Sequence, residues 1–381
     1  MQYTLITSDQ ALASFCTKAQ NAAAVAVDTE FVRTRTLYPK LGLIQLYDGE
    51  DLVLVDPLSI ENFSPLVDLL TNPSVIKVLH SCSEDLETFW QSLAVIPAPI
   101  YDTQFAACLL NMGATLGYAA LIDKMLEIKV DKGESRTDWI ARPLTKQQLH
   151  YAANDVLYLH QVYSTLKKQT DELDRTEWIF HEMAQLAKKK TIAPPAELAY
   201  LGFKNNWKLE PKALYVLKLL AKWRLEQARA RDLALNFVVR ESNLVEIARL
   251  QPTHKGALFA IDGMSPQEAR IHGEALLSIV EEAQHAPEEV YPQPIDRLME
   301  QKGFKKVAAE IRAYCQQKAA ELAIPVEVLG SKKQIQQLLK WHWKLQDELS
   351  AMGLMPDLII GWRATVLQDG VEQILSRYPG N

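Results

Sequence analysis

Short apolar runs alternate with helical patterns in the first third of the chain. Residues 24–27 form a compact run with two valines, and residues 75–79 form another β-branched run. Residues 41–47 and 52–55 are two further runs, separated by Asp48-Gly49, a dipeptide typical of hairpin turns. Strands interleaved with helices predict an α/β domain.

Two longer segments carry helical signals. Apolar positions recur at helical spacing over residues 148–166, which predicts a long helix. The uncharged stretch 103–122 is nominally long enough to span a membrane. Because it contains several polar residues and glycines, we interpret it as two helices broken at Gly113.

A domain boundary is predicted near the middle of the chain. Lys188-Lys189-Lys190 opens a predicted linker that includes Pro194-Pro195, and beyond it the chain reads as helices. Residues 232–239 resemble residues 321–328 at an offset of 89, which also aligns Ser242 with Ser331. Two tandem helical domains of about 80 residues are the simplest interpretation; chance similarity between two helical hairpins is the alternative.

The composition is that of an ordinary globular protein. The 381 residues are 48% hydrophobic and 23% charged, which excludes disorder for the bulk of the chain, and each domain has enough residues to bury a core. The four cysteines show no C-x-x-C spacing, so we expect a reducing, cytoplasmic location. We expect no membrane segment, because the 103–122 stretch contains polar residues and glycines. The net charge of −6 does not indicate nucleic-acid binding, although clustered carboxylates can mask a basic groove.

Three short motifs carry acidic residues. Asp28 and Glu30 end the first valine-rich run, so their side chains share one face of a strand, where a divalent metal would relieve their repulsion. Tyr151 and Asp155 are one helical turn apart. Asp85 follows the 75–79 run and opens a helix. Each motif alone more often marks solvated acids or packed side chains.

The order of the three motifs changes that balance. A strand D-x-E, a helix-borne Asp and a late Y-x-x-x-D within about 130 residues resemble the tyrosine-containing subclass of the DEDD superfamily of 3′→5′ exonucleases. The surrounding phrases, Asp102-Thr-Gln-Phe-Ala-Ala107 and Arg136-Thr-Asp-Trp139 with Arg142-Pro-Leu-Thr145, are similar to those of the ribonuclease D family. The helical repeats resemble HRDC domains, and the second copy is the more divergent.

The resemblance implies a fold and a domain order. The fold is an α/β ribonuclease H-like exonuclease domain followed by two all-α helical HRDC domains. The expected boundaries are 1–170 for the exonuclease domain, 171–205 for a helical segment and linker, 206–289 for the first HRDC domain and 293–376 for the second HRDC-like domain.

The resemblance also implies a mechanism. Two divalent ions, Mg²⁺ or Mn²⁺, would be held by Asp28, Glu30, Asp85 and Asp155, and Tyr151 would orient the attacking water. The expected products are nucleoside 5′-monophosphates released one at a time from a 3′ end. The expected partner is RNA with a free 3′ end, such as a tRNA precursor, with no obligate protein partner.

Substrate contacts are predicted from residue type. Phe31 could stack on a terminal base, or it could be a core residue. Basic residues should guide the phosphate backbone, unless they form an ordinary solvated helix face. The candidates are Lys188, Lys189 and Lys190, with Lys218, Lys222, Arg224, Arg229 and Arg231 in the first repeat. A histidine in the position of His80 is more often packed or hydrogen-bonded than part of an active site.

Two other functions remain compatible with the motifs. One is a DNA-directed 3′→5′ exonuclease of the same superfamily, although the chain contains no P-loop that would indicate an ATP-driven motor. The other is a non-catalytic RNA-binding protein. The intact acids and Tyr151 count against that reading, because clustered anions oppose phosphate binding.

Overall fold

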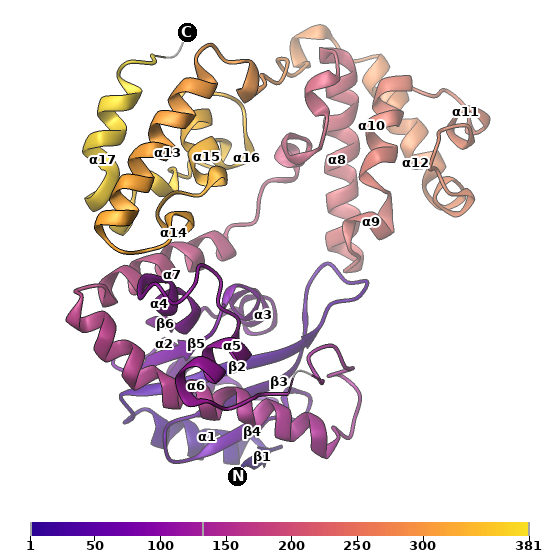
Figure 1. Cartoon of the computed structure of the whole chain (residues 1–381). Helices are drawn as coiled ribbons and strands as arrows, with labels where there is room; N and C mark the ends of the chain where they lie inside the picture. The colour runs from indigo at the N-terminus through magenta and orange to yellow at the C-terminus, as the bar shows by residue number, and fades with distance from the viewer. Residues whose placement is uncertain (1, 132, 380–381) are drawn as a thin grey trace.

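The N-terminal third forms a six-stranded mixed sheet. The structure, a computed structural model, describes residues 2–131 and 133–379 (Figure 1). The strand order is β1-β4-β3-β2-β5-β6; β2 runs antiparallel to β3 and parallel to β5, and the 40–55 segment forms the predicted hairpin. The strands are β1 (Thr4–Ile6), β2 (Ala24–Val32), β3 (Lys40–Tyr47), β4 (Leu52–Val55), β5 (Ile76–Leu79) and β6 (Ile100–Asp102).

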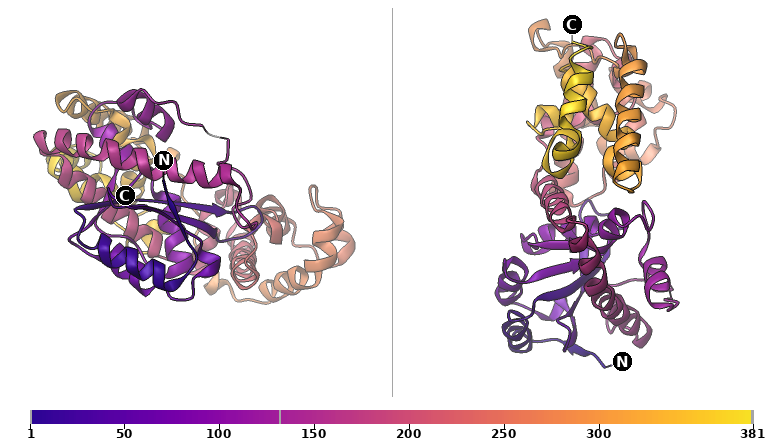
Figure 2. Two further views of the ribbon diagram at one scale, coloured as in Figure 1. Left: turned by 90° about the horizontal axis from the view of Figure 1, so that it is seen from below. Right: turned by 60° about the vertical axis from the view of Figure 1, so that its left-hand side comes forward.

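Helices cover both faces of this sheet. The long helix α6 crosses one face, and α1 and α2 lie on the other (Figure 2). The predicted break near Gly113 is confirmed, because α4 ends before it and α5 begins after it. The helices are α1 (Asp9–Ala19), α2 (Ser64–Thr71), α3 (Ser83–Leu93), α4 (Thr103–Leu109), α5 (Tyr118–Leu126), α6 (Lys146–Glu172) and α7 (Thr176–Thr191).

Two helical domains follow, as the repeat predicts. Each copy places a long helix before a four- or five-residue helix, then a second long helix. The first helical domain contains α8 (Pro211–Arg231), α9 (Leu235–Val238), α10 (Glu241–Leu250), α11 (Lys255–Phe259) and α12 (Pro266–Gln284). The second helical domain contains α13 (Phe304–Glu321), α14 (Val326–Gly330), α15 (Lys332–His342), α16 (Glu348–Ala351) and α17 (Gly361–Leu375). Short 3₁₀ turns lie at 57–59, 196–202, 206–208, 288–290, 298–300 and 357–359.

The hydrophobic cores do not follow the three-domain division. The buried residues of the second helical domain join those of the sheet in one continuous cluster. The connection runs through α7 and α17, where the Trp178 and Trp362 rings stack with centroids 4.8 Å apart. The first helical domain has a cluster of its own, from Tyr200 to Ala283.

Candidate active site

The β2 strand carries the first two acids. The sequence indicates that Asp28 and Glu30 end a strand, but β2 continues to Val32, so both lie inside it. β3 stays paired with β2 through this region, whereas the pairing with β5 covers only residues 24–26. The acids therefore lie where β2 runs beyond the carboxyl end of its parallel neighbour, a position that commonly forms binding sites in α/β folds.

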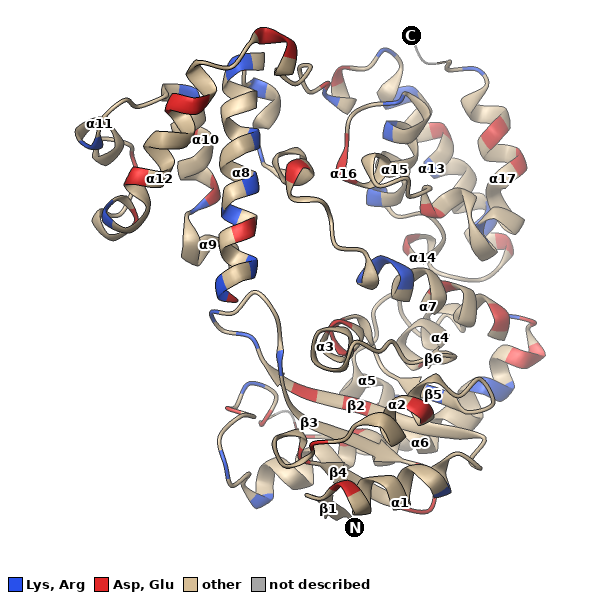
Figure 3. Ribbon diagram, turned by 180° about the vertical axis from the view of Figure 1, so that it is seen from behind, with Lys and Arg blue, Asp and Glu red and all other residues tan. Residues whose placement is uncertain are grey.

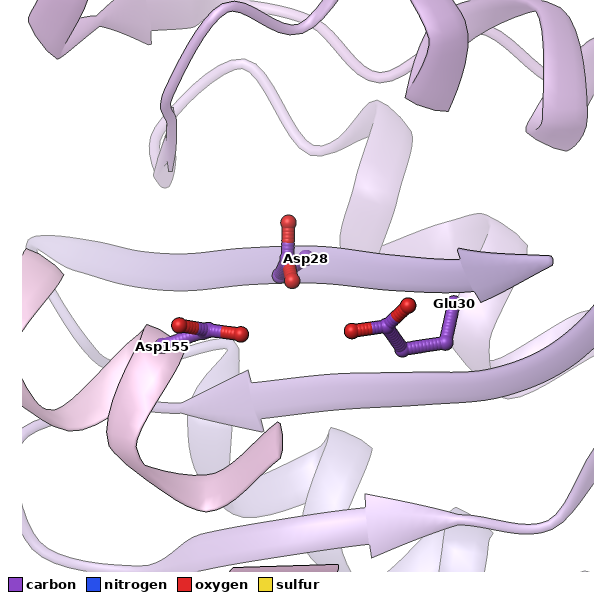
Figure 4. A group of neighbouring side chains, drawn as sticks. All are labelled: Asp28, Glu30 and Asp155. Carbon is purple, nitrogen blue, oxygen red and sulfur yellow. The ribbon is translucent and has the colours of Figure 1, made fainter. Parts of the chain in front are cut away.

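A third acid comes from α6. One carboxylate oxygen each from Asp28, Glu30 and Asp155 lies within 4.8 Å of the other two. Figure 4 shows the three groups turned toward one another from β2 and α6. The Tyr118 hydroxyl donates to the main-chain oxygens of Asn154 and Asp155, at 2.8 and 2.7 Å, and so ties this turn of α6 to α5. The described residues thus contain an acidic group able to hold a metal ion.

The fourth predicted ligand, Asp85, lies beside this group. It belongs to the first turn of α3, and its Oδ1 accepts a 2.5 Å hydrogen bond from the Thr29 hydroxyl. Asp85 is not among the three carboxylates that converge within 4.8 Å, but its charge contributes to raising the pKa of Asp28. The α3 N-terminus is held in place because the Cys82 amide donates to Asp102, which also caps α4.

Burial raises the pKa of all four carboxylates, and the charges of neighbouring acids add to this effect at Asp28 and Glu30. Burial is the main cause in each case, and it raises the pKa of Glu30 to about 9, that of Asp155 to about 8 and that of Asp85 to about 7. The pKa of Asp28 also rises, through burial and then through the charges of the other three. Oxygen ligands clustered in this way are what a hard divalent cation requires, and its charge would offset their repulsion.

An unsatisfied amide beside the acids supports the same conclusion. Gln45 lies directly opposite Asp28 in the β2–β3 ladder, so the two side chains share a face. Gln45 is fully buried, and neither Nε2 nor Oε1 has a hydrogen-bond partner among the described residues. Such groups normally find a partner or ordered water. Because Mg²⁺ usually keeps several of its waters, an amide next to the carboxylates fits a hydrated ion.

Tyr151 lies one turn before Asp155 on α6 and packs against the segment that precedes this helix. Its ring lies 6.2 Å from that of buried Trp139, between centroids. Arg142 anchors this segment by donating to both carboxylate oxygens of Asp56 and to the main-chain oxygen of Gly42. Burial and then the charge of Asp155 raise the pKa of Tyr151, so its hydroxyl stays protonated at neutral pH.

Sequence reasoning did not assign these supporting roles. The sequence indicates Trp139 and Arg142 only as members of a family phrase, and it gives no signal for Tyr118. His80 packs behind Tyr118, with ring centroids 5.7 Å apart, and its Nδ1 lies 2.9 Å from the Thr103 hydroxyl. Trp139, Arg142 and Tyr118 carry no local sequence signal for these roles, because they meet the active site only through the fold.

The predicted linker lysines have a different setting. Lys188, Lys189 and Lys190 form the last turn of α7, so their assignment to a linker is wrong. Lys189 pairs with Asp357 of the second helical domain, and Lys190 pairs with Glu87 of α3 at 3.2 Å. Lys188 is exposed. Two of the three cations therefore hold the fold together, although their distal faces remain partly accessible.

The other predicted substrate contacts divide into partly accessible residues and residues that are buried or paired. Phe31 is half-buried and belongs to neither hydrophobic cluster of the described residues, so it is not a core residue. Arg229 is half-buried and donates to the Pro194 main-chain oxygen at 2.8 Å. Arg224 is buried in the first helical domain, so it is not free to bind phosphate, whereas Lys222 pairs with Glu197 and keeps a side chain that is 40% exposed.

Comparisons with known proteins agree with the architecture. A family model described as 3′-5′ exonuclease matches residues 3–171, an HRDC domain model matches 213–280, and a model of the ribonuclease D C-terminal HRDC domain matches 302–371. Among the described residues, no helix is both long enough and apolar enough to cross a membrane.

Full-length relatives share this organisation. The chain is 45% identical to ribonuclease D of Serratia proteamaculans over 99% of this chain and 100% of that protein. It is 43% identical to ribonuclease D of Escherichia coli over the full length of both. The crystal structure of the Escherichia coli enzyme, described as an exoribonuclease involved in structured RNA processing, superposes with a TM-score of 0.95 at 42% identity and covers both chains completely.

Proposed function

The chain belongs to the ribonuclease D family, and from that premise we propose that it trims the 3′ ends of structured RNA precursors, such as those of tRNA, in the cytoplasm. Its activity is that of a metal-dependent 3′→5′ exoribonuclease. The observation that carries the assignment is the convergence of Asp28, Glu30 and Asp155 within 4.8 Å at the open end of β2.

The acidic group supplies the metal ligands. Two Mg²⁺ or Mn²⁺ ions held by Asp28, Glu30, Asp155 and Asp85 would supply an activated water and would neutralise charge on the phosphate and on the leaving 3′-oxygen. Thr29 orients Asp85 by donating a hydrogen bond to its Oδ1. The Gln45 amide can donate hydrogen bonds to waters around such ions and can accept hydrogen bonds from them.

Tyr151 orients the reacting water. Its hydroxyl remains protonated, so it acts as a hydrogen-bond partner rather than as a base. Water oxygen bonds to phosphorus, the bond from phosphorus to the 3′-oxygen of the penultimate nucleotide breaks, and that oxygen takes up a proton. The product is a nucleoside 5′-monophosphate, and the shortened RNA ends in a 3′-hydroxyl.

The terminal nucleotide must be unpaired to reach the buried acids. Phe31 follows Glu30 directly on β2 and is free of the hydrophobic clusters, so it is placed to stack on that nucleotide. Lys188 and the accessible parts of Lys189, Lys190 and Arg229 would contact the phosphates further along the RNA.

One time course tests the assignment. RNA and DNA of equal sequence, labelled at either end, are incubated with and without Mg²⁺, and the products are separated by size. We expect single-nucleotide 3′ shortening of RNA that requires Mg²⁺. Asp155→Asn should abolish it, and Tyr151→Phe should lower kcat on the order of 10²-fold with metal affinity unchanged. Hydrolysis by Asp155→Asn within tenfold of wild type would contradict the proposed site.

A further inference from the structure

A cleft on the first helical domain is bordered by one residue of the catalytic domain. Its volume is about 530 Å³; nine of its ten lining residues lie in or beside α9 and α12, and Arg35 of the loop after β2 is the tenth. Figure 3 shows Lys and Arg positions along the loop between β2 and β3, which rises from the acidic positions of β2 to the foot of α8. We call it the Phe237 cleft, after the exposed aromatic residue that lines it.

The cleft is formed by a fixed contact between the two domains. The Ala234 amide donates to the Arg35 main-chain oxygen at 2.8 Å, and the Tyr38 amide donates to Asp232 Oδ1 at 3.0 Å. Leu37 packs against the core of the first helical domain. Because these bonds use the loop backbone, the Arg35 side chain remains free to face the cleft.

The lining combines exposed apolar groups with unpaired cations. Phe237 is 55% exposed and Ile271 is 58% exposed. The Arg35 guanidinium lies 5.9 Å from the Phe237 ring centre, and neither Arg35 nor Arg240 forms an ion pair in the described part of the chain. Glu268 is the one lining carboxylate, and main-chain amides of Arg240 and Ser265 already occupy its oxygens.

The helical fold does not require this exposed aromatic. In the structure the two copies correspond at an offset of 91 rather than 89, because Ala234 and Pro325 cap the two short helices. Arg240 and Ser331 likewise cap the helices that follow. Phe237 therefore corresponds to Val328, which is 8% exposed and belongs to the shared core. The first copy leaves an aromatic in solvent where the second copy buries an aliphatic residue, and Phe237 lines the same cleft as the exposed Ile271, an apolar pairing typical of ligand sites.

The position of the cleft relates it to the active site. Glu30 and Arg35 are five residues apart along one chain segment, so no more than about 18 Å separates their backbones. We propose that the Phe237 cleft binds an unpaired nucleobase of the substrate RNA, a few nucleotides before the reacting 3′ end. The base stacks on Phe237, and Arg35 and Arg240 contact the adjoining phosphates, as in other single-strand sites. This inference rests on the proposed exoribonuclease function.

Hairpin RNAs with 3′ tails of different length test the cleft. A dinucleotide is too short to reach it, whereas a ten-nucleotide tail spans it. On the long tail, Phe237→Ala should raise KM on the order of tenfold and leave kcat unchanged, because one stacking contact is lost. Hydrolysis of the dinucleotide should not change. Phe259→Ala is the matched control, since Phe259 is 43% exposed in the same domain but lies outside the cleft.

The outcomes separate the cleft from the proposed function. Wild-type protein that cleaves neither substrate overturns the function itself. If the wild type is active but Phe237→Ala behaves like Phe259→Ala, only the role of the cleft is overturned. If Phe237→Ala is equally defective on the dinucleotide and on the long tail, the role of the cleft is overturned as well. As a second measurement, Asp155→Asn is photocrosslinked to tails that carry one 5-iodouridine at successive positions. We expect crosslinks to the peptide containing Phe237 from one or two adjacent positions; none at any position also overturns the cleft.

Discussion

The two helical domains arise from the same repeat and meet the catalytic domain in opposite ways. The second domain is joined to it by a continuous hydrophobic core, in which Trp362 of α17 is 2% exposed and stacks on Trp178 of α7. The first domain keeps a separate core and meets the β2–β3 loop through one main-chain hydrogen bond, one hydrogen bond from the Tyr38 amide to the Asp232 carboxylate, and the packing of Leu37.

Polar contacts reinforce the difference. Arg363, nearly buried, forms a salt bridge with Glu182 of α7, and Glu182 also accepts from the Trp362 indole. Lys189 and Asp357 add a second ion pair at this interface. The first domain instead presents Phe237 and Arg240 to a cleft beside the catalytic strand. The second copy thus acts as part of the catalytic scaffold, whereas the first copy offers surface for a substrate.

Removing each domain should have the largest effect. A chain that ends at residue 292 exposes Trp178 and its neighbours, so we expect the truncated protein to self-associate and to lose cooperative unfolding. A chain with a Gly/Ser linker in place of residues 206–289 should fold and cleave short oligonucleotides. Circular dichroism melting and size-exclusion chromatography measure both outcomes. Equal melting of the truncated and full-length chains would show that the shared core is not needed.

Two single substitutions, one in each helical domain, give the same comparison without a deletion. Trp362→Ala removes a buried ring and should lower the free energy of unfolding by about 3–5 kcal/mol. Phe237→Ala removes an exposed ring, so its effect should stay within about 0.5 kcal/mol. Urea unfolding followed by tryptophan fluorescence and circular dichroism provides both values. If the two substitutions cost the same, the assignment of different roles to the repeats fails.

Metal binding should reveal which parts of the chain unfold together. Acids whose folded pKa is raised stabilise the fold below the unfolded pKa near 4, and this stability is lost as pH rises through about 7–9, the folded values for Asp85, Asp155 and Glu30. In EDTA, melting temperature should therefore fall between pH 5 and pH 9. Mg²⁺ at about 100 times Kd should restore about 2.7 kcal/mol at the alkaline end.

Calorimetry assigns that stabilisation to one part of the protein. Two transitions are expected, one for the catalytic and second helical domains together and one for the first helical domain. Mg²⁺ should shift only the transition that contains the acids. A shift of both by the same amount would mean that all three domains unfold as one unit.

The contact between the first domain and the loop should give the smallest effect. Asp232→Ala removes the acceptor for the Tyr38 amide and should cost about 1 kcal/mol. Asp232→Asn is the control, since it keeps an acceptor and tolerates the positive φ of 47° at this residue. The alanine variant should raise KM for long-tailed RNA, whereas its melting temperature should change only slightly. A KM equal to that of Asp232→Asn would separate the contact from substrate binding.

Local sequence determined the parts of this protein that depend on neighbouring residues. Alternation on β2 fixed a shared face for Asp28 and Glu30, helical spacing aligned Tyr151 with Asp155, and the repeat predicted two helical domains. These are properties of strand and helix geometry, which act over a few residues. The motif order then indicated the family, because it recorded which elements must meet.

Tertiary structure decided everything that depends on residues far apart in the chain. It placed Gln45 unsatisfied beside Asp28, set Trp139 against Tyr151, and turned Lys189 and Lys190 from predicted linker cations into ion-pair partners. It also merged the second helical domain with the sheet while leaving the first apart. Two copies of one pattern carry the same local preferences, so only the surface that each copy meets, α7 for one and the β2–β3 loop for the other, could make them different.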